Sequence, residues 1–212
     1  MRRLFLACAA LLLGATGCAG TPPSPVSSSP TAEATSAGRP SSLTTCNETC
    51  PLAPGTYGAD FHDPITITIE DEGWQLEPAD GSDVVLVTRT EDPSQRVTFY
   101  PGPTGALADV EGLARLFQTT PEIDLSEPRT ISIGGAPAVE VDATPTGSQA
   151  ASLSLAGNAI EVQPDRAYRF TLAQAPMLEE GALHLIVTEA PTSDLVQFLP
   201  LADRILATLR FT

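Results

Sequence analysis

The chain has 212 residues, with 26 acidic residues against 11 basic ones and a formal net charge of −15. This balance excludes a nucleic-acid partner, because binding to phosphate needs a basic surface. All 11 basic residues are arginine, so a P-loop, a Ser-x-x-Lys nucleophile and lysine Schiff-base chemistry are excluded as well.

The N-terminal segment has the pattern of an export signal. Arg2 and Arg3 precede an uncharged apolar run over residues 4–14, and small residues at 15–17 lead directly to Cys18. A charged start, an apolar core of about 7–15 residues and a small-residue cleavage site are typical of secretory signals. Because a membrane span takes roughly 20 apolar residues, we expect residues 1–17 to be a removable signal peptide.

Residues 14–18, Gly-Ala-Thr-Gly-Cys, resemble the bacterial lipobox, with Ala15 at the place where that pattern prefers leucine. The resemblance implies that the Cys18 thiol receives diacylglycerol and that Cys18 becomes the first residue of the mature protein. Acyl chains hold a protein on a membrane. The expected location is therefore the cell membrane, with a lipid anchor on the extracytoplasmic side. An ordinary signal peptide with an incidental cysteine is the alternative.

After the cysteine, residues 18–45 consist almost entirely of Ser, Thr, Pro, Ala and Gly. Such a composition buries too little apolar surface to offset the entropy of ordering, and its prolines favour extended conformations. We therefore predict a disordered linker over residues 18–45 and a single globular domain over residues 46–212.

Two cysteines, Cys46 and Cys50, stand at the start of this domain. An exported compartment permits disulfides, and a tight turn brings such positions to the Cα separation of about 4.4–6.8 Å that a disulfide needs. We predict a Cys46–Cys50 disulfide. A redox-active pair and half of a metal site stay open as alternatives, and tetrahedral zinc would need further ligands such as His62 and His184.

Strands dominate the expected structure of the domain. Strict alternation of Ile and Thr over residues 65–69 predicts a half-buried strand, and the turn at residues 71–73 predicts a hairpin with residues 74–77. The pair Gly134-Gly135 predicts a second hairpin. Its strands are residues 129–133 and 138–142, and further strands are expected over residues 84–89, 96–100, 152–155, 160–163, 168–172, 183–188 and 207–211.

Two segments have helical spacing of apolar residues. The first covers residues 107–117. The second begins at Ser193 or Asp194, both N-cap residue types, and continues to residue 206. Pro200 kinks this helix or marks its first turn. Together these elements predict an α+β fold, an antiparallel β-sheet with two packed helices.

Several motifs are similar to those of exported proteins and lipoproteins of actinobacteria. They are Leu-Ala-Pro-Gly-Thr-Tyr at residues 52–57, Phe61-x-x-Pro64-Ile65-Thr66, and Gly73-Trp74. Residues 133–138 and 205–211 resemble elements of PsbP-like domains, which include LpqN-type mycobacterial lipoproteins. The resemblance covers about residues 52–212. It implies an α/β/α sandwich around an antiparallel sheet, usually a binding or assembly module, and carries over no catalytic residues.

The sequence offers two candidate sites. Asp60, His62 and Asp63 place a histidine among carboxylates, which suits metal ligands or an acid–base pair. Asp63-Pro64 is also typical of a solvated loop that opens a turn, the interpretation we favour. Trp74, the single tryptophan, lines a binding groove or packs in the core; tryptophan is enriched in binding sites, but core packing is the simpler expectation.

No Gly-x-Ser-x-Gly, His-Glu-x-x-His or Gly-x-Gly-x-x-Gly motif occurs in the chain, and nothing in it predicts a cofactor. We therefore expect a membrane-anchored binding or assembly module rather than an enzyme. Its partners would be the membrane, through the lipid on Cys18, and a cell-envelope protein or a small apolar ligand. The alternatives are a structural accessory subunit of a cell-envelope complex and a metal- or carboxylate-dependent hydrolase.

Overall fold

A computed structural model of the chain contains two compact units, Met1–Gly38 and Arg39–Thr212. The structure describes residues 41–43, 48–61, 64–78, 84–104, 122–155, 158–175 and 182–212, all of them in the second unit. Strands dominate this described part, together with one helix, α2 (Leu195–Thr208). Within the same residues, no helix is long and apolar enough to cross a membrane.

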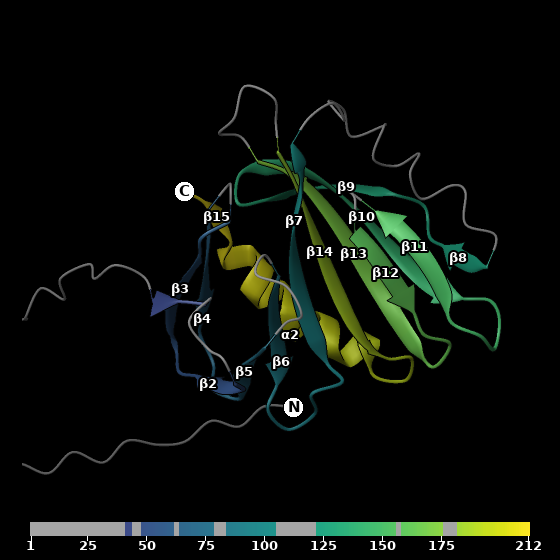
Figure 1. The fold of residues 1–212 in the computed structure, drawn as a ribbon, viewed down its shortest axis with the longest axis horizontal. Coiled ribbons are helices and arrows are strands. Elements are labelled where there is room, and N and C mark those ends of the chain that lie inside the picture. Colours follow the sequence, from purple (N-terminus) through teal and green to yellow (C-terminus); the bar gives the residue numbers. More distant parts are fainter. Residues whose placement is uncertain are drawn as a thin grey trace, which may run out of the picture. The chain divides into compact units, whose positions relative to one another are not determined.

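The largest element is a nine-stranded sheet in which every pairing is antiparallel (Figure 1). Its strand order is β2-β5-β6-β7-β14-β13-β10-β8, and β9 pairs with β10. The strands are β2 (Cys50–Leu52), β5 (Trp74–Glu77), β6 (Val85–Arg89), β7 (Arg96–Thr104), β14 (Ala182–Pro191), β13 (Arg166–Gln174), β10 (Ala136–Pro145), β8 (Ile123–Leu125) and β9 (Arg129–Ile133).

Strand β14 shows that this sheet is covered on both faces. Every residue from Leu183 to Ala190 is buried, although successive side chains of a strand point to opposite faces. A strand buried on both faces needs apolar residues at nearly every position, which explains its unbroken apolar run at residues 185–187. His184 lies on the face opposite Leu183 and is buried against the rings of Phe61 and Phe211.

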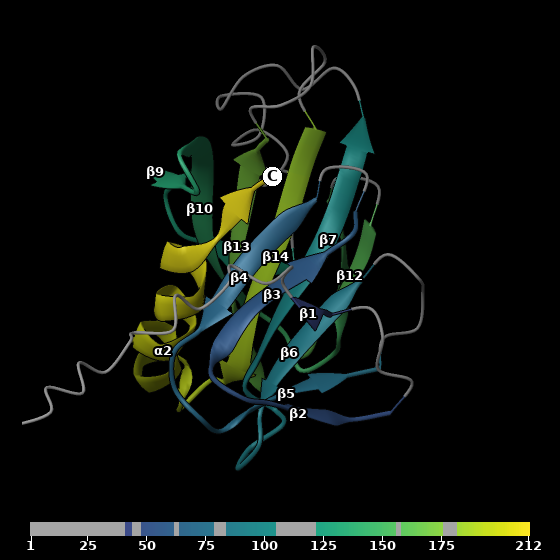
Figure 2. The same cartoon turned by 90° about the vertical axis from the view of Figure 1, so that its left-hand side faces the viewer.

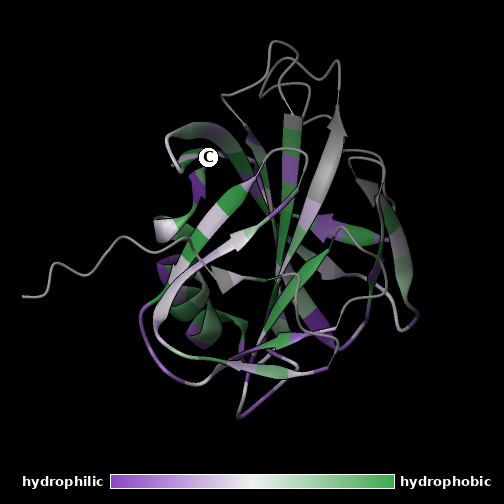
Figure 3. Ribbon diagram, turned by 60° about the vertical axis from the view of Figure 1, so that its left-hand side comes forward, coloured by the Kyte–Doolittle hydropathy of each residue, from purple (hydrophilic) through white to green (hydrophobic). Residues whose placement is uncertain are grey.

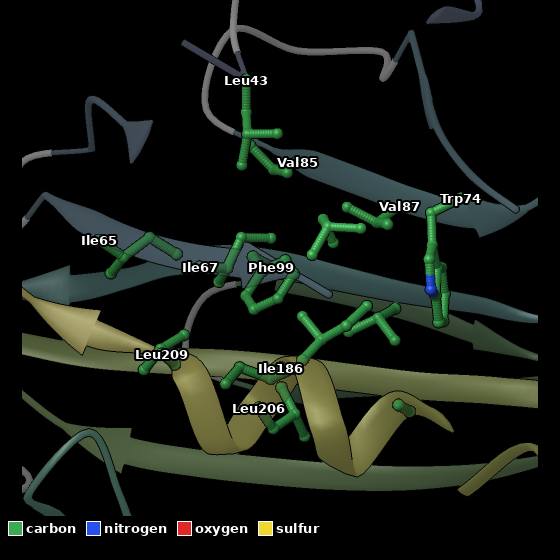
Figure 4. Packing of buried hydrophobic residues seen from close by; sticks show 14 of the residues in the cluster. Leu43, Ile65, Ile67, Trp74, Val85, Val87, Phe99, Ile186, Leu206 and Leu209 are labelled. Atoms are coloured by element: carbon green, nitrogen blue, oxygen red, sulfur yellow. The ribbon is translucent and has the colours of Figure 1, made fainter. Parts of the chain in front are cut away.

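One face of the large sheet is covered by α2 and a four-stranded sheet. In that smaller sheet β1 (Ser41–Ser42) runs parallel to β3 (Gly55–Ala59), while β4 (Ile65–Ile69) pairs antiparallel with β3 and with β15 (Arg210–Phe211). Figure 4 shows side chains of β4, β6, β7, β14 and α2 converging on one apolar core. We call this side of the large sheet the α2 face.

The other face is covered in part by a hairpin of β11 (Ala151–Leu155) and β12 (Asn158–Val162). Leu153 and Val162 of the hairpin belong to a second buried cluster, which also contains Phe170 of β13 and Leu185 of β14. Figure 2 shows α2 and β12 on opposite sides of β13 and β14. We call this side the hairpin face. Apolar and polar residues alternate along many of the strands, as Figure 3 shows.

Two glycines explain the sharp turn between β9 and β10. Gly134 and Gly135 have φ values of 60° and 82°, and Ile133 pairs with Ala136 across them. A two-residue hairpin loop with positive φ at both positions is a type I′ turn, which strongly favours glycine. A Cβ atom on Gly134 would also lie 2.9 Å from the carbonyl oxygen of Leu209. The predicted hairpin is therefore confirmed, with β10 beginning two residues earlier than expected.

Most predicted strands are confirmed with shifted ends, and so is the second helix. Asp194 is the N-cap residue of α2, but its side chain makes no capping bond; its carboxylate accepts a hydrogen bond of 2.7 Å from Ser193 Oγ instead. Pro200 lies inside the helix. The helix expected over residues 107–117 lies outside the described residues.

The expected α/β/α sandwich is corrected, because strands form more of the described structure than the sandwich implies. The described residues form a mostly antiparallel β structure with one helix, and the layer that they place on the hairpin face is β11–β12 rather than a helix. The alternation in these two short strands is regular, since Ala151, Leu153, Ile160 and Val162 are buried. Their buried sides therefore cover the sheet as a helix would.

The boundary expected between linker and domain is also too late. Ser41–Ser42 forms β1 and pairs with Tyr57 and Gly58, and Leu43 is only 3% exposed. The backbone amide of Leu43 donates a hydrogen bond of 2.8 Å to the carbonyl oxygen of Gly58. Composition alone assigns residues 41–43 to the linker. A single buried leucine and a short ladder of backbone hydrogen bonds nevertheless attach them to the domain.

Candidate ligand-binding pocket

The carboxylate–histidine candidate is not decided by the structure. Asp60 follows β3 and is exposed, while His62 and Asp63 lie outside the described residues. Among the residues that the structure does describe, no group of three or more His, Cys, Asp or Glu side chains could hold a metal ion. The geometry therefore adds nothing to the metal or acid–base interpretation of this segment.

Trp74 is a core residue rather than the wall of a groove. Its side chain is 4% exposed, and its ring lies 6.0 Å from the ring of Phe198, between centroids. The guanidinium carbon of Arg89 lies 4.9 Å from the Trp74 ring centroid, a cation–π geometry. Trp74 therefore packs in the core, between the large sheet and α2.

The cysteine pair and the lipid site are not decided by the structure. Cys50 lies in β2 and is partly buried against the core of the α2 face. Cys46 and Cys18 lie outside the described residues. The Cys46–Cys50 disulfide and lipid attachment at Cys18 stay predictions.

A pocket of about 410 Å³ lies on the hairpin face. Its volume is within the range of roughly 300–1,000 Å³ that is typical of small-molecule sites. We call it the β7/β14 pocket, because its floor comes from these two strands. Its lining residues are Pro78, Val84, Leu86, Arg96, Thr98, Tyr100, Ala159, Ile160, Glu161, Gln163, Val187 and Glu189.

Strand register places the floor residues side by side. Arg96, Thr98 and Tyr100 alternate along β7 and so point to one face. In the ladder between β7 and β14, Arg96 is opposite Glu189 and Thr98 is opposite Val187. On the other side of β7, Thr98 is opposite Leu86 of β6. Polar and apolar side chains of three strands therefore meet on one surface.

Glu189 is the buried centre of the charged part of this floor. Its side chain is 8% exposed, and it forms ion pairs with Arg96 and with Arg166. The Nε atom of Arg166 lies 3.5 Å from a Glu189 carboxylate oxygen, and an Nη atom of Arg166 donates a hydrogen bond to the carbonyl oxygen of Ser94. One carboxylate thus serves two guanidinium groups.

Burial affects the titration of the groups around Glu189. Burial, followed by the like charge of Arg166, lowers the pKa of Arg96, although a guanidinium remains charged at neutral pH. Burial raises the pKa of the Tyr100 phenol, and nearby Arg96 acts in the opposite direction. Tyr100 therefore remains a neutral hydroxyl that can donate or accept a hydrogen bond.

Tyr168 fixes the wall of the pocket that β12 provides. Its hydroxyl accepts a hydrogen bond of 2.8 Å from the backbone amide of Gln163, a residue that lines the pocket just after β12. The Tyr168 ring is buried and stacks on Phe170 with 6.0 Å between centroids. The hairpin wall is therefore held by a hydrogen bond as well as by apolar packing.

The chemistry of the pocket suits an organic ligand rather than a metal ion. Guanidinium groups repel cations, and the single buried carboxylate is already paired with two of them. The remaining groups are the exposed carboxylate of Glu161, hydroxyls, an amide and apolar side chains. Polar and apolar groups share this lining, so the pocket suits a molecule that has both a polar and an apolar part.

A second charged cluster, on the α2 face, has a structural role. Arg169 Nε lies 2.7 Å from carboxylate oxygens of both Glu140 and Asp142, and Arg129 lies 2.6 Å from Glu140. Burial opposes the charge on Arg169, but the hydrogen bond and attraction of Asp142, with Glu140, raise its pKa overall. These pairs connect β9, β10 and β13.

The sequence interpretation missed the residues of the β7/β14 pocket, although a signal for them exists. Glu189 follows the apolar run of β14 in a strand expected to be buried, and an isolated carboxylate there needs a partner. Arg96 begins the neighbouring alternating strand. The pairing of β7 with β14 was the missing information, because nothing in the local sequence specifies which strands are neighbours.

Comparison with known proteins identifies no family. No family model matches the chain, and no curated protein is a significant match. Among solved structures, the chain is similar to LpqN, involved in cell envelope biogenesis of Mycobacterium tuberculosis, at 15% identity over 78% of this chain and 91% of that chain, with a TM-score of 0.48.

Two further solved structures are similar to a comparable degree. One is a protein from Bacteroides thetaiotaomicron, at 9% identity over 70% of this chain and 45% of that chain, with a TM-score of 0.42. The other is the cyanobacterial PsbP of Synechocystis sp. PCC 6803, at 10% identity over 79% of this chain and 94% of that chain, with a TM-score of 0.44. Similarity this low assigns no ligand or activity to the chain.

Proposed function

We propose that this chain is a lipid-anchored extracytoplasmic lipoprotein of the cell envelope whose domain binds a small amphipathic ligand in the β7/β14 pocket. The observation that carries the proposal is the pocket itself, which places the buried carboxylate of Glu189 and the guanidinium of Arg96 beside apolar side chains within about 410 Å³. A purely structural domain would gain more stability from apolar side chains at Arg96 and Glu189, because buried ion pairs are weak contributors to stability.

The anchor is supported by the sequence. An export signal over residues 1–17, the lipobox-like residues 14–18 and the Ser/Thr/Pro-rich segment that follows agree with one another. We expect Cys18→Ser to move the protein from the membrane fraction to the soluble exported fraction, with loss of the mass of the lipid. Ser27→Ala, in the same segment, is the matched control and should leave the protein on the membrane. Membrane retention of the Cys18→Ser protein would contradict the anchor.

Native mass spectrometry of the protein purified from its own membrane tests the binding proposal. We expect a small molecule to remain bound to the wild-type protein and to be lost from Leu86→Trp, which fills the pocket from the half-buried Leu86. Val196→Trp adds the same ring at a position that is 78% exposed on α2, so this control should keep the ligand.

The accessory-subunit alternative gives a different result in the same experiment. An empty wild-type protein that carries a stoichiometric protein partner, unaffected by Leu86→Trp, would replace the ligand-binding proposal with that alternative. A ligand retained equally by Leu86→Trp and Val196→Trp would place the binding site elsewhere and would also overturn the proposal.

A further inference from the structure

We infer that the β7/β14 pocket selects an amphiphile with one negative charge, a carboxylate at the head of a hydrocarbon chain, and binds that carboxylate through Arg96. This inference rests on the proposed function and adds the chemical class of the ligand. Three observations carry it: the charge balance of the pocket floor, the donors that Arg96 has left, and the position of a second carboxylate at the rim.

The floor carries one positive charge in excess. Arg96 and Arg166 share the single carboxylate of Glu189, so two positive charges face one negative charge, and the side chains of Glu189 and Arg166 are largely removed from water. Charges in such surroundings interact more strongly than in bulk solvent. An anionic group entering the pocket would therefore be attracted to this floor, even though the whole chain is strongly acidic.

Arg96 has hydrogen-bond donors available for that anion. Its nearest contact with Glu189 is through Nε, and within the described part of the chain no residue other than Glu189 forms a hydrogen bond or ion pair with Arg96. Its side chain is 38% exposed and lines the pocket. Two Nη groups at the end of a guanidinium match the two oxygens of a carboxylate.

The charged cluster on the α2 face has the opposite charge balance. There, Arg129 and Arg169 are surrounded by three carboxylates, those of Glu140, Asp142 and Asp203. No positive charge is left over in that cluster. Two guanidinium groups therefore face three carboxylates in that cluster, whereas Arg96 and Arg166 share the one carboxylate of Glu189 beside the pocket.

The rest of the pocket restricts the ligand further. Glu161 is exposed on β12 at the rim, and its carboxylate repels a second negative charge outside the floor. Val84 and Leu86 are half-buried beside the floor, and Pro78 and Ile160 add apolar surface. A hydrocarbon chain would remove this surface from water. One acidic head group with an apolar tail fits this arrangement.

The test compares three probes with the same hydrocarbon chain. Decanoate, neutral decyl glucoside and cationic decyltrimethylammonium are titrated calorimetrically, below their micelle concentrations, into the full chain carrying Cys18→Ser. This substitution removes the site of the lipid. We expect decanoate to bind at least about tenfold more tightly than decyl glucoside, as a charge-assisted hydrogen bond implies. The cation should bind most weakly.

Two variants locate the head group. Arg96→Met should lower the affinity for decanoate about tenfold and leave that for decyl glucoside unchanged, while Arg210→Met, at an exposed position on β15, should change neither. Glu161→Gln should strengthen decanoate binding, because it removes the repulsion at the rim. This rim variant keeps the test decisive if Arg96→Met does not fold.

The outcomes separate the inference from the proposal beneath it. Equal binding of decanoate and decyl glucoside, or the strongest binding for the cation, would overturn the anionic ligand while the binding function stands. Absence of binding by all three probes would overturn the pocket itself as an amphiphile site, and with it both statements. Decanoate binding that Arg96→Met and Glu161→Gln leave unchanged would place the carboxylate elsewhere and would overturn the inference.

Discussion

The two faces of the nine-stranded sheet are closed in different ways. On the α2 face, side chains from β4, α2 and the sheet form one apolar core that runs from Leu43 to Leu209. On the hairpin face, β11–β12 covers the part of the sheet around β13, and the part over β6 and β7 holds the β7/β14 pocket. The same sheet thus supplies a sealed core on one side and a partly open polar surface on the other.

Because of this difference, we expect one face of the sheet to determine the stability of the domain and the other to determine ligand binding. Removing Glu189 or Arg96 from water lowers stability unless their attraction offsets the loss of hydration, whereas apolar packing contributes wherever it is complete. We therefore expect substitutions on the α2 face to act mainly on the free energy of unfolding. Substitutions around the pocket should act mainly on ligand affinity.

The largest effect on stability is expected for Phe198→Ala. Phe198 is 1% exposed and packs against Trp74 between α2 and the large sheet, so truncation removes buried surface and leaves a cavity. The expected loss is about 3–5 kcal/mol in the free energy of unfolding, measured by urea denaturation. Val196→Ala, at the exposed position two residues earlier, should change it by less than about 0.5 kcal/mol. Similar losses in the two variants would mean that α2 does not seal this face.

A smaller and more local effect is expected for Leu153→Ala on the hairpin face. Leu153 is 1% exposed, but β11 and β12 pair only with each other. The hairpin can therefore separate from the sheet without the rest of the domain unfolding. We expect a loss of about 2–3 kcal/mol, at the low end for such a truncation. Hydrogen exchange should accelerate in β11–β12 and stay unchanged in α2. Equal acceleration in α2 would show that the two faces unfold as one unit.

A still smaller effect is expected from the predicted Cys46–Cys50 disulfide. Closing so short a loop between Cys46 and Cys50 contributes about 2 kcal/mol in the chain-entropy model. The double variant Cys46→Ser/Cys50→Ser should lose about that amount, read from the midpoint of urea denaturation. Alkylation of the unreduced, denatured wild-type protein should find neither thiol available. Labelling of both cysteines would contradict the disulfide.

The sequence predicted the regular elements better than their arrangement, for reasons that particular residues show. Alternation identified β4, and Gly134-Gly135 identified the β9–β10 turn, because both signals are local. The strand β3 was missed because its two glycines and single large side chain, Tyr57, give no alternation of apolar residues, although it pairs with β4. The ion pair of Arg96 with Glu189 joins residues far apart in the chain. Its prediction needed the strand order, which no local pattern contains.

The smallest expected effect comes from Asp203, an exposed residue of α2 near the ion cluster of the α2 face. Burial raises its pKa above the ordinary value of 3.8, and the charges of Arg169 and Arg129 oppose that shift only in part. The folded state therefore holds this proton more tightly than the unfolded state. The contribution of the protonated Asp203 carboxyl to the free energy of unfolding is complete below about pH 3.8 and is lost as the pH rises through the raised pKa.

Replacing Asp203 with asparagine tests this direction. The side chain of Asn cannot ionise, so the stability of Asp203→Asn relative to wild type should increase as the pH rises from 3.8 towards neutrality. The change should be small, because the Asp203 side chain is 55% exposed and solvent screens its charge. Melting temperatures of both proteins across this range give the measurement. A difference that shrinks with rising pH would mean that attraction by Arg169 outweighs burial, and the ion cluster would then stabilise α2 through Asp203 itself.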